Sequence, residues 1–229
     1  MHYYPVNLDL NGRKCIVFGG GRVAERKVAR LLECGARVVV VAPELTPRLA
    51  GLTSSGRLEH LASTYQEDYL AGAFLTIGAT NSEAINAAVS QACGKAGILC
   101  NIADDPEKCS FTLPALVQRG DFCLAISTGG KSPALAKRTR LEMERLYGDE
   151  YAEFVDLMGR VRDRVLSREH FEDEAARAQM FERLAGSELP RLIKFRDRAA
   201  IDTLLRDLLG EGFSLAELLG SSENGAKWQ

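Results

Sequence analysis

Two adjacent carboxylates stand between two thiols in the segment CNIADDPEKCSF, residues 100–111. Side chains of these types can form a metal site, a disulfide loop, a turn or a site of proton transfer. Asp104 ends an apolar run, and a carboxylate at the carboxyl end of a parallel strand faces the crevice where doubly wound sheets bind ligands. Asp105 precedes Pro106, which is typical of a turn. Asp104 is therefore the candidate proton acceptor, with a structural role in the turn as the alternative.

The metal and disulfide interpretations have less support. The cysteines lie at positions 15, 34, 93, 100, 109 and 123 without a CxxC pair or a repeated spacing, and His2, His60 and His170 are far apart. A chain of this length can bury a core without metals or disulfides. We therefore expect reduced, mostly buried thiols and no metal site made by the protein.

A glycine-rich turn, GGGRVAERK, follows the apolar run KCIVF and precedes a helical pattern that extends from Arg22 to Cys34. Gly19, Gly21 and Ala24 have the GxGxxA spacing of dinucleotide-binding turns, in which a pyrophosphate is bound by the start of a helix. A glycine turn that binds nothing is the alternative, but strand, turn, helix and second strand together favour dinucleotide binding.

The second strand, RVVVV, lacks the acidic residue expected near Ala42 for binding a ribose, so this contact falls to Glu44 or to the backbone around Pro43. NAD is favoured over NADP on this basis. The candidate cofactor-binding residues are Gly19, Gly21, Arg22, Val23, Ala24, Pro43, Glu44 and Thr80. Arg22 lies within the turn, whereas Arg26, Lys27 and Arg30 are expected to solvate an exposed helix face.

The elements that position these residues alternate between strand and helix as far as residue 113, which predicts a doubly wound parallel α/β sheet, the Rossmann fold. FTLPALVQ and FCLAIST then form a predicted hairpin through Arg119, Gly120 and Asp121. Beyond Ser132 the pattern is helical to about Leu219. We predict an NAD-binding domain at 1–113, a small α+β dimerisation region at 114–148 and a C-terminal helical domain at 149–229.

Composition excludes some classes of partner. The formal net charge is −2, which gives no general attraction to nucleic acid or to a membrane surface. No apolar run approaches the roughly 18 residues of a membrane span, and the N-terminus lacks the pattern of a signal peptide. A cytoplasmic location is the expectation.

Three segments, in this order and spacing, resemble the precorrin-2 dehydrogenase and sirohydrochlorin ferrochelatase family of sirohaem synthesis: GGGRVAERKVARLLECGARVVVVAPE, CNIADDPEKCSF and ISTGGKSPALAKRTR. The family includes the N-terminal half of the bacterial sirohaem synthase and the yeast bifunctional enzyme. The likeness is close as far as the third segment and loose over the helical remainder. Three ordered motifs are more specific than a glycine turn alone.

The resemblance implies NAD-dependent oxidation of precorrin-2 to sirohydrochlorin, followed in many members by insertion of ferrous iron at the same site. By position, Asp104 matches the functional aspartate of the family. The resemblance also implies a homodimer whose second region is exchanged or shared between subunits. The methyltransferase part of the fused enzyme is not expected here, so a separate protein would supply the dimethylated substrate.

Precorrin-2 carries eight carboxylates, so the protein needs local positive potential to bind it. The third segment leads into a predicted helix N-terminus, where N–H groups and the helix dipole favour an anion. Its candidate substrate-binding residues are Thr128, Gly129, Gly130, Lys131 and Ser132. An ordinary helix cap is the alternative, and Lys137, Arg138 and Arg140 are expected to be solvated. The resemblance matches Thr128 to a serine that can be phosphorylated in the fused enzyme, and modification of Thr128 itself is an open question.

Two other functions stay open at this point. One is a dehydrogenase without chelatase activity, and the other is a regulatory module that binds NAD or NADH without catalysis. A module of the second kind has no need of Asp104 or of the third segment. A dehydrogenase of small hydroxy acids is disfavoured, because such an enzyme needs a histidine or lysine in its crevice and His60 and His170 are poorly placed.

Overall fold

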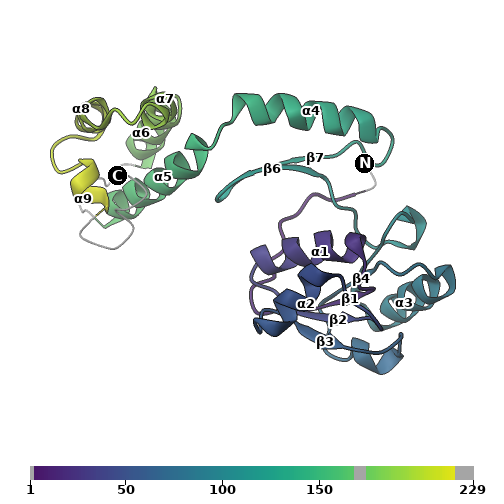
Figure 1. Cartoon of the computed structure of the whole chain (residues 1–229). Coiled ribbons are helices and arrows are strands. Elements are labelled where there is room, and N and C mark those ends of the chain that lie inside the picture. The colour runs from purple at the N-terminus through teal and green to yellow at the C-terminus, as the bar shows by residue number, and fades with distance from the viewer. Residues whose placement is uncertain (1–2, 168–173, 220–229) are drawn as a thin grey trace. The chain divides into compact units, whose positions relative to one another are not determined.

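A computed structural model of the chain describes residues 3–167 and 174–219. The chain divides into two compact units, residues 1–113 and residues 114–229 (Figure 1). Two of the three histidines, His2 and His170, lie outside the described residues.

The first unit contains a five-stranded sheet whose strands are all parallel. The strands are β1 (Lys14–Phe18), β2 (Arg37–Val41), β3 (Glu59–Leu61), β4 (Leu75–Gly78) and β5 (Leu99–Ile102). Their order in the sheet is β3-β2-β1-β4-β5, which reverses direction at β1. The predicted doubly wound α/β fold is confirmed. The reversal places the turns after β1 and β4 next to each other at one edge of the sheet.

Helices cover both faces of this sheet (Figure 1). They are α1 (Arg22–Glu33), α2 (Pro47–Ser54) and α3 (Glu83–Ala96), with short 3₁₀ turns η1 (Glu67–Leu70) and η2 (Pro106–Lys108). Ser82 caps α3 as predicted, because its hydroxyl accepts a hydrogen bond from the Ile85 N–H. The sequence patterns did not predict α2. Leu49 is its single buried residue, so apolar periodicity is nearly absent from it.

Alternate residues of the strands face two separate apolar cores. Cys15 and Val17 of β1 pack with Val28 of α1, whereas Ile16 and Phe18 pack on the opposite face of the sheet. Burial on both faces explains why these strands are continuous apolar runs rather than alternating ones. The sheet is thus a rigid base for the turns at its carboxyl edge.

The second unit begins with a hairpin of β6 (Ala115–Arg119) and β7 (Phe122–Ile126), paired antiparallel as predicted. Helix α4 (Pro133–Leu146) follows and contacts both strands. None of the side chains of α4 is buried, and Leu135 and Leu146 are 46% and 64% exposed. The described part of this region therefore has almost no core of its own.

Helices α5 to α9 form a separate apolar core, which agrees with the predicted helical C-terminal region. They are α5 (Glu150–Leu166), α6 (Glu174–Ala185), α7 (Leu189–Lys194), α8 (Arg198–Leu209) and α9 (Leu215–Leu219). The largest fully buried side chain of this core is Phe213. Within the described ranges of the chain, none of the helices is both long and apolar enough to span a lipid bilayer.

Candidate active site

Two positions of the turn after β1 need glycine because backbone atoms of neighbouring loops lie close to them. Gly19 has a φ of +116°, and a Cβ there would collide with the backbone carbonyl of Ala79 after β4. A Cβ on Gly20 would collide with the carbonyl oxygen of Glu44 after β2. The turn is therefore held between the neighbouring loops, and larger residues at these two positions would push them apart.

The third glycine, Gly21, has a different role. It is the N-cap residue of α1, and as a glycine it has no side chain that could accept a hydrogen bond from the first turn of this helix. A Cβ on Gly21 would meet no other atom within 4 Å, so the space beside it is open. Unused N–H groups together with open space are what a phosphate group needs at a helix N-terminus. This arrangement fits the pyrophosphate of a dinucleotide.

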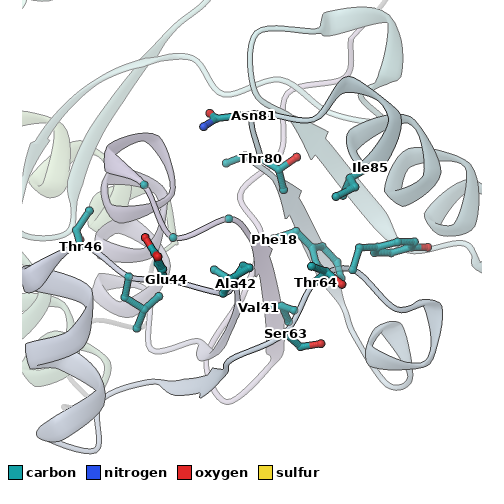
Figure 2. A pocket seen from close by; sticks show the side chains of 17 residues that line it. Phe18, Val41, Ala42, Glu44, Thr46, Ser63, Thr64, Thr80, Asn81 and Ile85 are labelled. Atoms are coloured by element: carbon teal, nitrogen blue, oxygen red, sulfur yellow. The ribbon is translucent and has the colours of Figure 1, made fainter.

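A pocket of about 530 Å³ lies over the carboxyl ends of β1, β2, β3 and β4. Glu44 and Thr46 lie on one side of it, and Thr80, Asn81 and Ile85 lie on the other (Figure 2). Its volume is in the range of small-molecule and cofactor sites.

Five of the eight predicted cofactor residues line this pocket, namely Gly19, Gly21, Pro43, Glu44 and Thr80. The other three do not line it. Ala24 is fully buried between α1 and the sheet, while Arg22 is exposed and Val23 is half-buried. Ala24 therefore serves helix packing, as expected of the last position of a GxGxxA turn.

Sequence reasoning missed one wall of the pocket, which Ser63, Thr64 and Tyr65 form after β3. The ring of Tyr65 packs edge to face on Phe18, with ring centroids 5.1 Å apart. Burial, with a smaller contribution from Glu67, raises the pKa of the Tyr65 hydroxyl. The predicted strand LEHLAS was a usable signal, because the residues after a parallel strand reach the same edge as the glycine turn.

Side-chain hydrogen bonds hold two of the pocket loops in place. The hydroxyl of Thr80 donates to Oδ1 of Asn86 at 2.8 Å, and the Asn86 amide donates to the Thr80 carbonyl at 3.0 Å. After β2, Nε2 of His60 lies 2.9 Å from the carbonyl oxygen of Ala42. His60 is thus engaged by the backbone of the pocket wall, and its side chain is only partly buried.

The turn after β5 uses nearly all of its polar groups internally. Sγ of Cys109 accepts a hydrogen bond from the Ile102 N–H at 3.1 Å, and the Ser110 hydroxyl accepts one from the Cys100 N–H at 2.8 Å. Asp105 accepts a bond from Nζ of Lys108 at 2.6 Å, which lowers the pKa of Asp105. Asp105 is therefore a turn residue.

Asp104 is the exception in this turn. Its φ is +62°, an uncommon backbone conformation for a residue with a side chain. The residue is exposed, and within 3–167 and 174–219 its carboxylate makes no hydrogen bond or ion pair. It does not line the pocket, but it follows β5, which pairs with β4 at the same carboxyl edge. The structure thus presents this carboxylate at the end of the strand that pairs with β4, and Thr80 lies in the loop after β4.

The described cysteines are all free thiols, and the described part of the chain holds no cluster of three metal-ligating side chains. Cys15, Cys93 and Cys100 are buried, Cys109 is half-buried, and Cys34 and Cys123 are exposed. The thiols that flank the two carboxylates therefore belong to the packing and hydrogen bonding of β5 and its turn.

Sequence comparisons match both units. A family described as "Putative NAD(P)-binding" matches residues 6–115, and one described as "Sirohaem biosynthesis protein central" matches residues 119–146. Siroheme synthase 1 of Aeromonas salmonicida is 37% identical over 212 residues, and a siroheme synthase of Nitrosospira multiformis is 39% identical over 216 residues. Each alignment covers 92% of this chain and 45% of the relative. The chain therefore spans a little under half the length of these curated relatives.

A solved structure of SirC, a precorrin-2 dehydrogenase, superposes with a TM-score of 0.72 and 28% sequence identity. The superposition covers 85% of this chain and 96% of SirC. The chain is thus similar in both units to proteins of sirohaem synthesis, among them a precorrin-2 dehydrogenase. The resemblance inferred from the three sequence segments is thus confirmed, as is the prediction of an NAD-binding domain.

The third family segment forms the turn before α4. Ser132 caps the helix by accepting a hydrogen bond from the Leu135 N–H at 3.2 Å, and Thr128 Oγ1 accepts one from the Ser132 N–H at 3.0 Å. Ser127 accepts a further bond from the Gly129 N–H. Several N–H groups that could have bound an anion are therefore satisfied by hydroxyls of the protein.

The basic residues of α4 are partly neutralised. Arg138 and Arg140 form ion pairs with Glu142 and Glu144, one helical turn further on. Lys131 is exposed and has no such partner among the described residues. The side chain of Lys131 is thus the strongest cationic group of the predicted substrate loop.

Lys27 differs from the expectation of a solvated helix face. Its side chain is half-buried and reaches β5, where Nζ donates to Oδ1 of Asn101 at 3.3 Å. Arg30 of the same helix is exposed and pairs with Glu33, as expected of a surface residue. Helical periodicity alone could not separate the two, because it does not show that α1 packs within reach of β5.

Proposed function

We propose that this protein oxidises precorrin-2 to sirohydrochlorin with NAD and that Asp104 is the proton acceptor. The unpaired carboxylate of Asp104 is the single observation that supports this role most directly. Its neighbour Asp105 is bound to Lys108, whereas Asp104 keeps a backbone conformation that glycine would adopt more easily. Residues in such conformations occur often at functional sites.

The reaction removes two hydrogen atoms from the macrocycle. One leaves as a hydride, which NAD accepts when bound, and the other leaves as a proton. A positioned carboxylate that takes the proton contributes about 10²–10⁴-fold to the rate of such a step. Asp104 can return this proton to water, because its side chain is exposed.

The residues that would hold the cofactor follow from the pocket. The uncapped first turn of α1 would bind the pyrophosphate, and Gly21 leaves room for it. Glu44 would bind a ribose hydroxyl, and repulsion between its carboxylate and a 2′-phosphate favours NAD over NADP. Thr80 would face the middle of the dinucleotide from the loop after β4.

The decisive experiment supplies the purified protein with precorrin-2 and NAD without air and follows NADH formation and the visible spectrum. Asp104→Asn removes the charge at nearly constant size and tolerates the same backbone conformation, so we expect turnover to fall by about 10²–10⁴-fold with NAD affinity unchanged. Asp105→Asn is the matched control and should retain turnover.

The experiment also separates the rival functions. A wild-type protein that binds NAD but forms no NADH from precorrin-2 would support a sensing module and contradict the dehydrogenase. Equal activity of wild type and Asp104→Asn would place the base at another residue.

We also propose that the protein inserts ferrous iron into sirohydrochlorin, with the Asp104 carboxylate as the base. Insertion must remove two pyrrolic protons, and an exposed, unpaired base can accept and release them in turn. The macrocycle itself supplies four nitrogen ligands, so the protein needs no metal cage. Mixing sirohydrochlorin, ferrous iron and protein without NAD, and recording the absorption spectrum, tests this activity separately. A rate equal to that of the reaction without protein would leave the protein a dehydrogenase only, and an accelerated rate that Asp104→Asn retains would place the base at another residue.

For the second unit we propose a homodimer formed through residues 114–148, with Thr128 to Ser132 near the substrate. The exposed leucines of α4 support this, since a helix without buried side chains needs a further apolar surface. Light scattering coupled to gel filtration measures the assembly. A monomer at micromolar concentration would contradict the proposal.

A further inference from the structure

Lys27 has spare hydrogen-bonding capacity beside the proposed base. An ammonium group has three N–H donors, and the described contacts of Lys27 use one of them, on the neutral side-chain oxygen of Asn101. Among the described residues no carboxylate lies within ion-pair distance of Lys27. A half-buried cation without an anionic partner is unfavourable and calls for an explanation.

Asn101 fixes the place of this ammonium. The residue is only 7% exposed, and its amide nitrogen donates to the Phe111 carbonyl oxygen at 3.1 Å and to Sγ of Cys109 at 3.5 Å. These bonds aim the amide oxygen at Lys27. Asn101 also precedes Asp104 by three residues, so one short segment positions both charged groups.

The charges around Lys27 show that Asp104 is near but is not its direct partner. Burial lowers the pKa of Lys27, and Arg26 on the same helix adds to this effect. The Cys109 thiol and the Asp104 carboxylate oppose it by raising the same pKa. No ion pair joins Lys27 to Asp104. The cation and the carboxylate are therefore close enough to interact, while both keep free hydrogen-bonding capacity.

We propose that Lys27 is a substrate-positioning residue that binds a carboxylate of the tetrapyrrole and thereby places the macrocycle against Asp104. This inference rests on the function proposed above. Precorrin-2 carries carboxylate side chains on all four pyrrole rings. Any ring atom that reaches Asp104 therefore brings a carboxylate close to it, and the ammonium of Lys27 is a nearby cation with unused donors.

The test compares three variants in the anaerobic assay. Lys27→Met removes the charge and keeps an unbranched side chain, so KM for precorrin-2 should rise roughly tenfold or more, as expected for the loss of a charged hydrogen bond. Because Lys27 does not touch the pocket, kcat and the dissociation constant of NAD should stay within about twofold. Lys27→Arg should restore most of the KM. Arg26→Met removes one charge from the same helix and should leave KM near wild type.

Other outcomes overturn the inference. A fall in kcat with an unchanged KM would mean that Lys27 acts on Asp104 and not on the substrate. Weaker NAD binding, or an equal loss in Arg26→Met, would indicate a structural or general electrostatic role.

Binding without turnover distinguishes this inference from the proposed function. Uroporphyrin, an octacarboxylate porphyrin, can be titrated by absorbance into wild type and Lys27→Met even if the wild type forms no NADH. A weaker affinity of the variant supports the lysine site although the dehydrogenase assignment fails. An equal affinity for uroporphyrin, together with an equal KM where turnover is measurable, overturns the lysine site.

Discussion

Two glycine-rich loops lead into helices in this protein, and they differ in how the N–H groups at the start of the helix are bonded. At α1, Gly21 provides no cap, and the space beside it is open. At α4, Ser132 and Thr128 accept hydrogen bonds from the N–H groups that begin the helix. The two segments look alike as anion sites in sequence, but hydroxyl groups of the protein occupy N–H donors at α4, whereas α1 has no side-chain cap.

The difference lies in hydroxyl groups and not in glycine content. A helix N-terminus binds an anion when its N–H groups have no partner within the protein. Serine and threonine next to the glycines remove that condition at α4. The proposed contribution of the 128–132 turn to substrate binding would therefore depend mainly on the side chain of Lys131.

The largest effect is expected for Gly19→Ala. The new methyl group would collide with the Ala79 carbonyl, and a φ of +116° is unfavourable for alanine. Overpacking and backbone strain together should cost about 3 kcal/mol or more of the stability of the first unit and weaken NAD binding. Gly130→Ala is the control, since it has a φ of +81° but open space, and should cost about 1–2 kcal/mol. Calorimetry and hydrogen exchange measure the loss of stability in both variants. Equal losses in Gly19→Ala and Gly130→Ala would contradict the expected difference between the two turns.

Gly21→Ser gives α1 a serine N-cap like the one that Ser132 provides at α4. Stability should change by only a few tenths of a kcal/mol, because glycine is itself a fair N-cap. NAD affinity should fall roughly tenfold, since the hydroxyl would occupy N–H groups and space meant for the pyrophosphate. Isothermal titration with NAD gives the dissociation constant. Unchanged affinity would show that the start of α1 does not bind the cofactor.

Ser132→Ala is the reciprocal change at the second turn. Loss of the bond to the Leu135 N–H should destabilise α4 by about 1 kcal/mol, while NAD affinity stays at the wild-type value. Hydrogen exchange of the peptides that cover α4 measures the first effect. Ser132→Thr should restore protection, and its failure to do so would argue against a capping role.

The smallest effect is expected in the turn after β5, where polar groups of the turn form hydrogen bonds with one another. The hydrogen bond from Lys108 lowers the pKa of Asp105 in the folded state, so its stabilisation is present above the unfolded pKa of about 3.9 and is lost as pH falls. Asp105→Asn should therefore be slightly less stable than wild type at pH 7. Denaturant unfolding should show that the free energies of unfolding of wild type and Asp105→Asn converge below about pH 4.

Some parts of the fold could be predicted because the signals were local. The run KCIVF, the glycines after it and the helix from Arg22 define a strand, a turn and a helix through short-range patterns. Helix α2 was missed, since it buries a single residue. Thr46 followed by Pro47 was a start signal for it, because Thr46 caps the helix and Pro47 occupies its first position.

The candidate site was predicted only in part, because its walls come from separate loops. Residues of the glycine turn could be identified from spacing alone, whereas Ser63 to Tyr65 join them through the order of strands in the sheet. Lys27 was expected to face water and instead reaches Asn101 of β5. A contact between a helix and a strand 74 residues away is set by packing, which periodicity does not encode.

By itself, the sequence predicted the resemblance to sirohaem-synthesis proteins and the dinucleotide turn. It also favoured Asp104 over Asp105 as the candidate base, because a proline follows Asp105 and a strand precedes Asp104. The tertiary structure decided which polar groups are still available. Among the described residues, the Asp104 carboxylate has no hydrogen-bond or ion-pair partner and the start of α1 has no side-chain cap, while hydroxyl groups accept hydrogen bonds from three N–H groups of the turn before α4. Hydrogen bonds between side chains and distant backbone groups make this distinction, and they exist only after the sheet and its loops have assembled.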